Sequence, residues 1–234
     1  MAGVNCMPLL AATNGGIDAN TLIMLQMNGS NGSTSIIDTS RHNRTVSVFG
    51  NAQITTARSK FLGASLAVDG SGDYLTVPDS NDWARGTGDL TIEAWVYLVT
   101  AANGGVICGQ WTGSDGFRFG MRTDNGRLYF QIFNSGGSAI LDITTTTVLS
   151  NGTWTHVAVI RNGNSWNVTK DGVAVGSATS SASLGNYIGV LQVASGTNSA
   201  VGATSLSQGN MSGFRISDVA RWTPPFTPQA YPYG

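Results

Sequence analysis

Hydrophobic and polar residues alternate along most of this chain, in runs that are too short for helices. In DLTIEAWVYL (residues 89–98), the even positions from 92 carry Ile, Ala, Val and Leu, whereas the odd positions from 91 carry Thr, Glu, Trp and Tyr. This period of two is typical of a β-strand with two different faces. WTHVAVIR (154–161) is apolar at both parities, which indicates a central strand.

Turn residues separate the predicted strands. TLIMLQM (21–27) is expected to be the first strand, and Asn125-Gly126 and Asp171-Gly172 are expected to lie at hairpin turns. At residues 171 and 172 we predict a two-residue turn, because its positive φ angles favour an Asp-Gly pair. Many short strands with turn signals every 8 to 12 residues or so predict an all-β fold, an antiparallel β-sandwich of the jelly-roll type.

Composition supports one large domain and limits the partners. The chain has 234 residues, 31 of them Gly, with 12 Lys and Arg against 13 Asp and Glu. Without a basic cluster we expect neither nucleic acid nor a membrane as a partner, and no apolar run approaches the ~20 residues of a membrane span. Cys6 and Cys108 are far apart, so neither a disulfide framework nor a zinc site is expected. The N-terminus lacks the basic region of a secretory signal, which indicates folding in a reducing cytoplasm.

Four ordered blocks resemble a known family. They are residues 50–83, 88–98, 152–178 and 211–232, the first containing SLAVDGSGDYLTVPD and the second GDLTIEAWVYL. Together they are similar to laminin-G-like jelly rolls of the concanavalin A-like lectin and glucanase superfamily, in the version found in tailed-phage virion proteins. The resemblance implies the sandwich fold and places residues 65–79 as two adjacent strands with their connecting turn. It does not fix a function, because the fold serves lectins, adhesins, hydrolases and structural modules.

Asp69 and Asp73 flank a Gly-Ser-Gly loop that could hold a cation or simply form a turn. Calcium needs about six oxygen ligands, and family members that bind it carry acids where this chain has Asn28 and Ser212. Residues 172–217 contain neither Asp nor Glu. We therefore expect no metal and no other cofactor, although calcium on this loop, with Asp79 or Asp82, is left open. The expected role of Asp69 and Asp73 is to cap backbone amides in a turn.

The residues do not favour catalysis. Glycanases of this superfamily use paired acids on one strand, whereas Glu93 stands alone with Trp95 and Tyr97 at the alternate positions. His156 lies within an apolar strand, where a packed, hydrogen-bonded role is commoner than that of a base, and His42 lies in a polar loop. We expect Glu93 to be a hydrogen-bonded strand residue and the protein not to be an enzyme.

Sugar binding is the sharper alternative. Tryptophan faces stack on pyranose rings while Asp, Asn and backbone groups bond the hydroxyls. Trp111 and Asp115, in GQWTGSDGF, and Trp83, in DSNDWARG, are the candidate carbohydrate-binding residues. Packing in the core or at an interface is the competing interpretation, even for Trp111.

The two ends of the chain suggest attachment. We divide the chain into an N-terminal arm (1–20) and a jelly-roll domain (21–234) with a Pro-rich tail that should be extended across a surface. Apolar residues of the arm are candidates for attachment to a partner: Val4, Met7, Leu9 and Leu10.

Our main hypothesis from the sequence is a non-enzymatic structural protein of a bacteriophage virion, assembled in the host cytoplasm. It would be a capsid decoration or cement subunit, or a small tail-associated module. Its partners would be virion proteins such as the major capsid protein, and we expect a homo-oligomer. The alternative is a carbohydrate-binding adhesion or receptor-recognition module with a cell-surface glycan as partner, and a glycan hydrolase ranks third.

Overall fold

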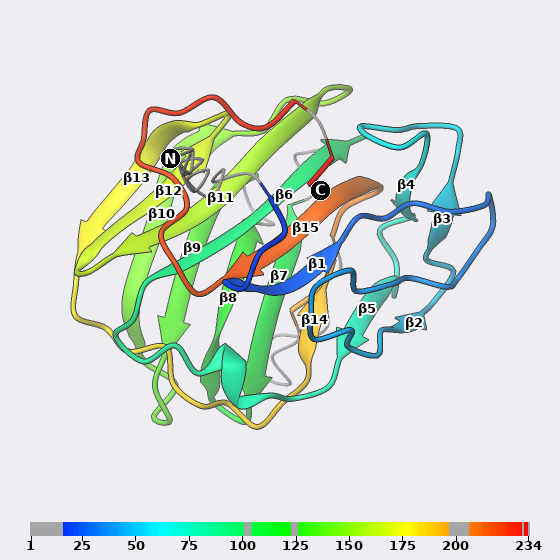
Figure 1. Cartoon of the computed structure of the whole chain (residues 1–234). Helices are drawn as coiled ribbons and strands as arrows, with labels where there is room; N and C mark the ends of the chain where they lie inside the picture. Colours follow the sequence, from blue (N-terminus) through cyan, green and yellow to red (C-terminus); the bar gives the residue numbers. More distant parts are fainter. Residues whose placement is uncertain (1–15, 101–103, 123–125, 197–205, 231, 234) are drawn as a thin grey trace, which may run out of the picture.

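The computed structural model describes residues 16–100, 104–122, 126–196, 206–230 and 232–233, which form a sandwich of two antiparallel sheets (Figure 1). In order across the first sheet, sheet A, the strands are β13 (Val173–Thr179), β12 (Ser165–Lys170), β11 (Trp154–Asn162), β6 (Leu90–Leu98), β15 (Gly209–Ser217), β4 (Ser65–Val68) and β3 (Gln53–Thr55), and β1 (Thr21–Leu25) also pairs with β15. Sheet B runs β10 (Ala139–Val148), β9 (Arg127–Phe133), β8 (Asp115–Met121), β7 (Gly105–Thr112), β14 (Leu191–Val193), β5 (Tyr74–Val77) and β2 (Ser47–Phe49). The predicted all-β fold is confirmed.

The core lies between the sheets and is built by strand alternation. Ile92 and Val96 of β6 face inward with Trp166 of β12, and Phe119 and Phe130 come from sheet B. These side chains are almost fully buried. The odd positions of β6 face the outer side of sheet A, as the alternation predicts.

The Asp171-Gly172 turn is confirmed in detail. Lys170 pairs directly with Val173, so the connection has two residues, and its φ angles are 49° at Asp171 and 81° at Gly172. The first strand is shorter than expected. It ends at Leu25, and Met27 has a φ of 60°, which a strand cannot continue.

The interpretation of residues 65–79 as two adjacent strands is wrong. β4 pairs with β15 and β3 in sheet A, whereas β5 pairs with β14 and β2 in sheet B. Leu66 of β4 and Leu75 of β5 both point into the core. The loop at residues 69–73 therefore crosses from one sheet to the other. The apolar side chains of β4 enter the core from sheet A, and those of β5 enter it from sheet B.

The C-terminal tail is extended, as predicted, and crosses the outer face of sheet A (Figure 1). The Phe226 ring contacts His156 edge-on, and its amide donates a hydrogen bond to the Gly172 carbonyl. The Trp222 ring stacks on Phe226 at 4.9 Å between centroids. The tail thus covers the middle of this face. Among the described residues, no helix is long and apolar enough to cross a membrane.

Two turn glycines, Gly172 and Gly163, allow the cost of backbone strain to be measured apart from the cost of a clash with the tail. A Cβ at Gly172 would lie 1.8 Å from the Phe226 carbonyl oxygen, whereas a Cβ at Gly163 would meet nothing within 4 Å. Both residues have positive φ, at 81° and 58°. We expect Gly163→Ala to lower the free energy of unfolding by about 1 kcal/mol through strain alone. Gly172→Ala should cost at least about 2 kcal/mol more, because the tail must also move.

Urea unfolding curves of both variants measure this difference, with Gly163→Ala as the matched control. Equal losses in the two variants would contradict the close packing of the tail against Gly172.

Candidate functional site

A row of polar side chains crosses the outer face of sheet B. Asp142 on β10, Gln131 on β9 and Arg118 on β8 are direct cross-strand neighbours. The Gln131 amide donates to Asp142 Oδ2 at 2.6 Å, and Arg118 Nε donates to Gln131 Oε1 at 2.9 Å. Gly109 and Gln192 continue this row on β7 and β14. The row holds a cation, an amide and an anion in fixed register.

Aromatic rings flank this polar row. The Trp111 and Phe133 ring centroids are 5.0 Å apart, and the Arg118 guanidinium lies 5.1 Å from the Phe133 ring and 5.6 Å from that of Tyr129. Gly116 lies between Trp111 and Phe133 in the register, and a Cβ there would come within 2.7 Å of the indole. A glycine at this position lets the indole lie across β8 and reach Phe133.

The outer face of sheet B carries neutral aromatic groups and charged side chains together. Burial raises the pKa of Tyr129 to about 12, against the opposing effect of Arg118, so its hydroxyl is neutral at ordinary pH. Asp142 is exposed, Arg118, Phe133 and Trp111 are half-buried, and Gln131 is buried. The face therefore offers an indole surface together with hydrogen-bond donors and acceptors, which is the equipment that recognises a ring bearing hydroxyls.

Only one of the three carbohydrate candidates lies on this face. Trp111 is the second-last residue of β7 and lies beside Phe133, and its Nε1 donates to the Gly113 carbonyl. Asp115 pairs with Thr112 at the hairpin and falls on the opposite parity of β8. The expectation that Trp83 is a loop residue open to a ligand is wrong. Trp83 is 3% exposed, because it packs into the core beneath the Arg44 guanidinium, 4.5 Å from its ring.

Sequence reasoning missed most of this face: Phe133, Arg118, Gln131, Asp142 and Tyr129 were not singled out. Their signal was the hairpin itself. In FRFGMR the second, fourth and sixth positions alternate with apolar core residues, and in RLYFQIF the third, fifth and seventh do so, and these two sets form one common face. Which residues meet across the strands depends on the register of the turn, which the sequence did not define.

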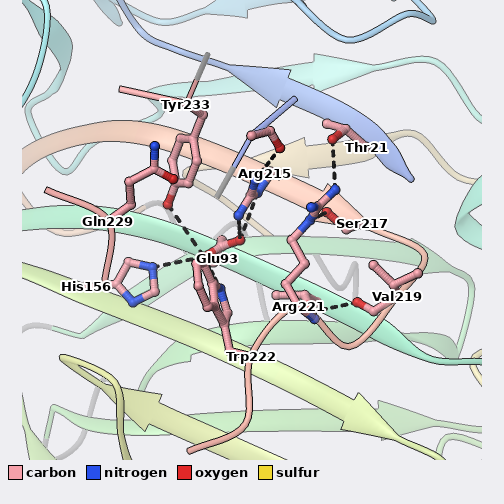
Figure 2. Close-up of polar contacts among 12 residues, drawn as sticks. Thr21, Glu93, His156, Arg215, Ser217, Val219, Arg221, Trp222, Gln229 and Tyr233 are labelled. Carbon is pink, nitrogen blue, oxygen red and sulfur yellow. Dashed lines mark hydrogen bonds and ion pairs between the residues drawn. The ribbon is translucent and has the colours of Figure 1, made fainter. Parts of the chain in front are cut away.

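The second polar cluster lies under the tail on sheet A (Figure 2). Glu93 is fully buried, and its Oε1 accepts from Arg215 at 2.8 Å and 2.5 Å. Its Oε2 lies 3.1 Å from His156 Nε2 and accepts from Trp222 Nε1 at 2.8 Å and from the Tyr233 hydroxyl at 3.5 Å. The predicted roles of Glu93 and His156 as hydrogen-bonded strand residues are confirmed.

The protonation of Glu93 follows from these contacts. Burial alone would raise its pKa, but Arg215 and His156 outweigh burial and hold the pKa at about 2. Glu93 is consequently ionised at neutral pH and accepts hydrogen bonds without a proton to give. Trp222 and Tyr233 of the tail donate the remaining hydrogen bonds to the Glu93 carboxylate. This carboxylate therefore holds the tail and does not face a substrate.

Asp69 and Asp73 bind backbone amides, as predicted. Asp73 accepts from the amides of Asn51 and Asp69, each at 2.7 Å, and Asp69 Oδ1 accepts from the Ser71 amide at 2.8 Å. Within the described residues no three acidic, His or Cys side chains gather as a metal site would require. Cys108 is buried, which raises the pKa of its thiol.

The end of the predicted arm is part of the domain. Asp18 forms an ion pair with Arg221 at 2.5 Å, and Arg215 donates to the Gly16 carbonyl at 2.9 Å. Four attachment candidates lie outside the described residues: Val4, Met7, Leu9 and Leu10.

A laminin-G-type family model, described as the concanavalin A-like lectin/glucanases superfamily, matches residues 69–229. The chain belongs to this superfamily. The resemblance noted from the sequence is thereby confirmed for the family, while the phage version of it stays a prediction. No curated protein matches the chain.

Several solved structures have the same fold as this chain. The binding domain of botulinum neurotoxin serotype D has a TM-score of 0.65 at 15% identity, covering 90% of this chain and 50% of that one. The serotype C1 binding domain gives a TM-score of 0.65 at 16% identity, covering 88% and 50%. The serotype DC binding domain in complex with rat synaptotagmin II gives 0.63 at 17% identity, covering 88% and 49%. The chain thus spans about half the length of these structures.

The buried carboxylate of this lectin-like domain should set its acid stability. Because the folded pKa of Glu93 is about 2 and its ordinary value is 4.5, the carboxylate stabilises the fold above pH 4.5, and this contribution is lost as pH falls from 4.5 toward 2. Glu93→Gln should lower the free energy of unfolding at pH 7 by about 3–5 kcal/mol, since it leaves Arg215 charged and buried. It should also flatten the loss of stability in that acid range.

Denaturant unfolding at a series of pH values measures both effects. Asp115→Asn, which neutralises a half-exposed carboxylate, is the control and should change neither. A Glu93→Gln protein as stable as the wild type at pH 7 would contradict the assignment of Glu93 as the anchor of the tail.

Proposed function

We propose that this protein is a non-enzymatic carbohydrate-binding module that recognises a cell-surface glycan through the outer face of sheet B. The observation that carries the proposal is the Trp111–Phe133 aromatic pair beside the Arg118–Gln131–Asp142 row. The indole offers a face for one sugar ring, and the polar row offers donors and acceptors to the hydroxyls of the same or the next ring.

The rigidity of the site supports recognition. These side chains project from the paired strands β7 to β10, and Gln131 fixes both Arg118 and Asp142 by hydrogen bonds. A ligand therefore meets a surface that is already ordered and loses less free energy on binding. Within the row the positive charge of Arg118 and the negative charge of Asp142 lie on either side of Gln131, which bonds both.

Binding fits this face better than hydrolysis does. A glycosidase needs two carboxyl groups about 5 to 9 Å apart. Across the described strands of sheet B, the outward row carries one carboxylate, Asp142, and its neighbours are Gln131 and Arg118. Glu93 lies on the other sheet beneath the tail. The similarity to neurotoxin binding domains supports a recognition role at the level of the fold.

The virion role inferred from the sequence is a separate proposal. It depends on the phage-type resemblance and on residues 1–15, which lie outside the described part of the chain. A capsid partner, a homo-oligomer and a virion location thus stay predictions. A glycan-binding module carried on a particle surface would satisfy both hypotheses.

Replacing the indole tests the proposed site. Trp111→Ala should weaken binding to any glycan that the wild-type protein selects on a glycan array by at least ~10-fold, because it removes the stacking surface. Trp154→Ala is the matched control. Trp154 is also half-buried and ring-packed, 5.7 Å from Tyr97, but it lies on sheet A.

The control should retain full binding, and both variants should keep the near-UV spectrum of a folded domain. A wild-type protein that selects no glycan at high micromolar concentration, or a Trp111→Ala protein that binds as well as the wild type, would refute the proposal.

A further inference from the structure

A hollow of about 200 Å³ lies on sheet A, between β3, β4 and the start of β15, and residues of the loops on either side line it. Ala67 on β4 and Ala57 in the loop after β3 leave the space open, and Val99 and Gln208 also line it. At roughly 30 Å³ per water molecule, the hollow has the volume of about six or seven waters. This is room for one small molecule and not for a segment of a protein.

Arg58 is fixed at the wall of this hollow. Its guanidinium lies 4.0 Å from the centroid of the Tyr97 ring, and its Nη1 donates to Asn210 Oδ1 at 2.8 Å. Asn210 Nδ2 donates to Ser65 Oγ at 3.1 Å, and Ser65 Oγ donates back to the Arg58 carbonyl at 2.6 Å. The three residues form a closed circuit of hydrogen bonds. The arginine is therefore positioned before any ligand arrives.

The charge of this arginine is uncompensated within the hollow. Among the described residues that line it, none carries a carboxylate, and Arg58 uses one donor direction on the neutral Asn210. The guanidinium has five N–H donors in a planar fork that matches a carboxylate with two parallel hydrogen bonds. The Nε edge of the fork is left for such a partner.

We propose that this hollow binds the carboxylate of a small acidic ligand, the size of a single uronic acid unit. The free edge of the Arg58 guanidinium would hold the carboxylate. Thr55 and the exposed Gln208 would bond hydroxyls of the ring, and Ala67 and Val99 would contact its apolar side. The site is independent of the glycan face proposed above, because it lies on the other sheet of the sandwich.

Titration of the ¹⁵N-labelled protein with sodium galacturonate tests the proposal, followed by NMR. We expect saturable shifts of the Arg58 Nε–H signal and of the amides of Ala57, Ala67 and Gly209. Galactose, which has the same ring without the carboxylate, should give no saturable shift of these signals. Sodium sulfate should bind more weakly, since it offers oxygens to Arg58 but no sugar ring to Thr55, Gln208, Ala67 and Val99. Saturable galactose binding here, or sulfate binding as tight as that of galacturonate, would overturn the proposal.

Two variants make the assignment specific. Arg58→Gln should weaken galacturonate binding by about 10- to 100-fold, the effect of losing hydrogen bonds to a charged group. Gln208→Glu changes an exposed rim residue, so folding is not at risk, and should weaken binding by added repulsion. Arg41→Gln, which removes an exposed arginine beside His42, is the control for net charge and should bind as the wild type does.

The two proposals fail separately. Trp111→Ala should leave galacturonate binding unchanged, and a protein that binds no glycan on an array can still show the Arg58 shifts. Wild-type affinity in a folded Arg58→Gln protein would overturn the assignment of this hollow, and so would wild-type affinity in Gln208→Glu if Arg58→Gln does not fold.

Discussion

A buried carboxylate organises one whole side of this molecule. Glu93 is placed in the central strand β6 with no exposure to water, where an ionised group is stable only if its oxygens are fully hydrogen-bonded. Arg215 on the neighbouring strand and His156 on the other neighbour supply part of this need, and Trp222 and Tyr233 of the tail supply the rest. The extended tail therefore covers sheet A because a charge beneath it must be satisfied.

Because the tail must cover Glu93, part of the outer surface has a structural role, and the uncovered parts are left for recognition. The middle of the outer face of sheet A is covered by the tail, and the Glu93 carboxylate there accepts from Trp222 and Tyr233 of the tail and not from a ligand. The hollow beside Arg58 lies on the same sheet among β3, β4 and β15, where Asn210 and Ser65 are the internal partners. On sheet B the row from Arg118 to Asp142 carries half-buried and exposed members that a ligand can reach. Polar side chains beneath the tail thus stabilise the fold, whereas those that nothing covers can contact a ligand.

Local patterns predicted local structure well, because each depended on neighbours in the chain. The alternation of β6 and the two-residue turn at Asp171-Gly172 are set by backbone geometry, and both were predicted correctly. The interpretation of β4 and β5 as adjacent strands was wrong, since a short apolar strand fits either sheet and only long-range pairing decides between them. The same holds for the meeting of Arg215 with Glu93, which are 122 positions apart.

The candidate site shows how a register decides chemistry. If Asn125 and Gly126 formed a two-residue turn, Arg118 would lie opposite Phe133. Arg122 instead pairs with Arg127 across a longer connection, and Arg118 lies opposite Gln131. Both registers leave the same residues on the outer face, since they differ by two positions. Only the observed one joins the guanidinium, the amide and the Asp142 carboxylate into a continuous row, and it sets Phe133 opposite Gly116, where the indole of Trp111 can reach it.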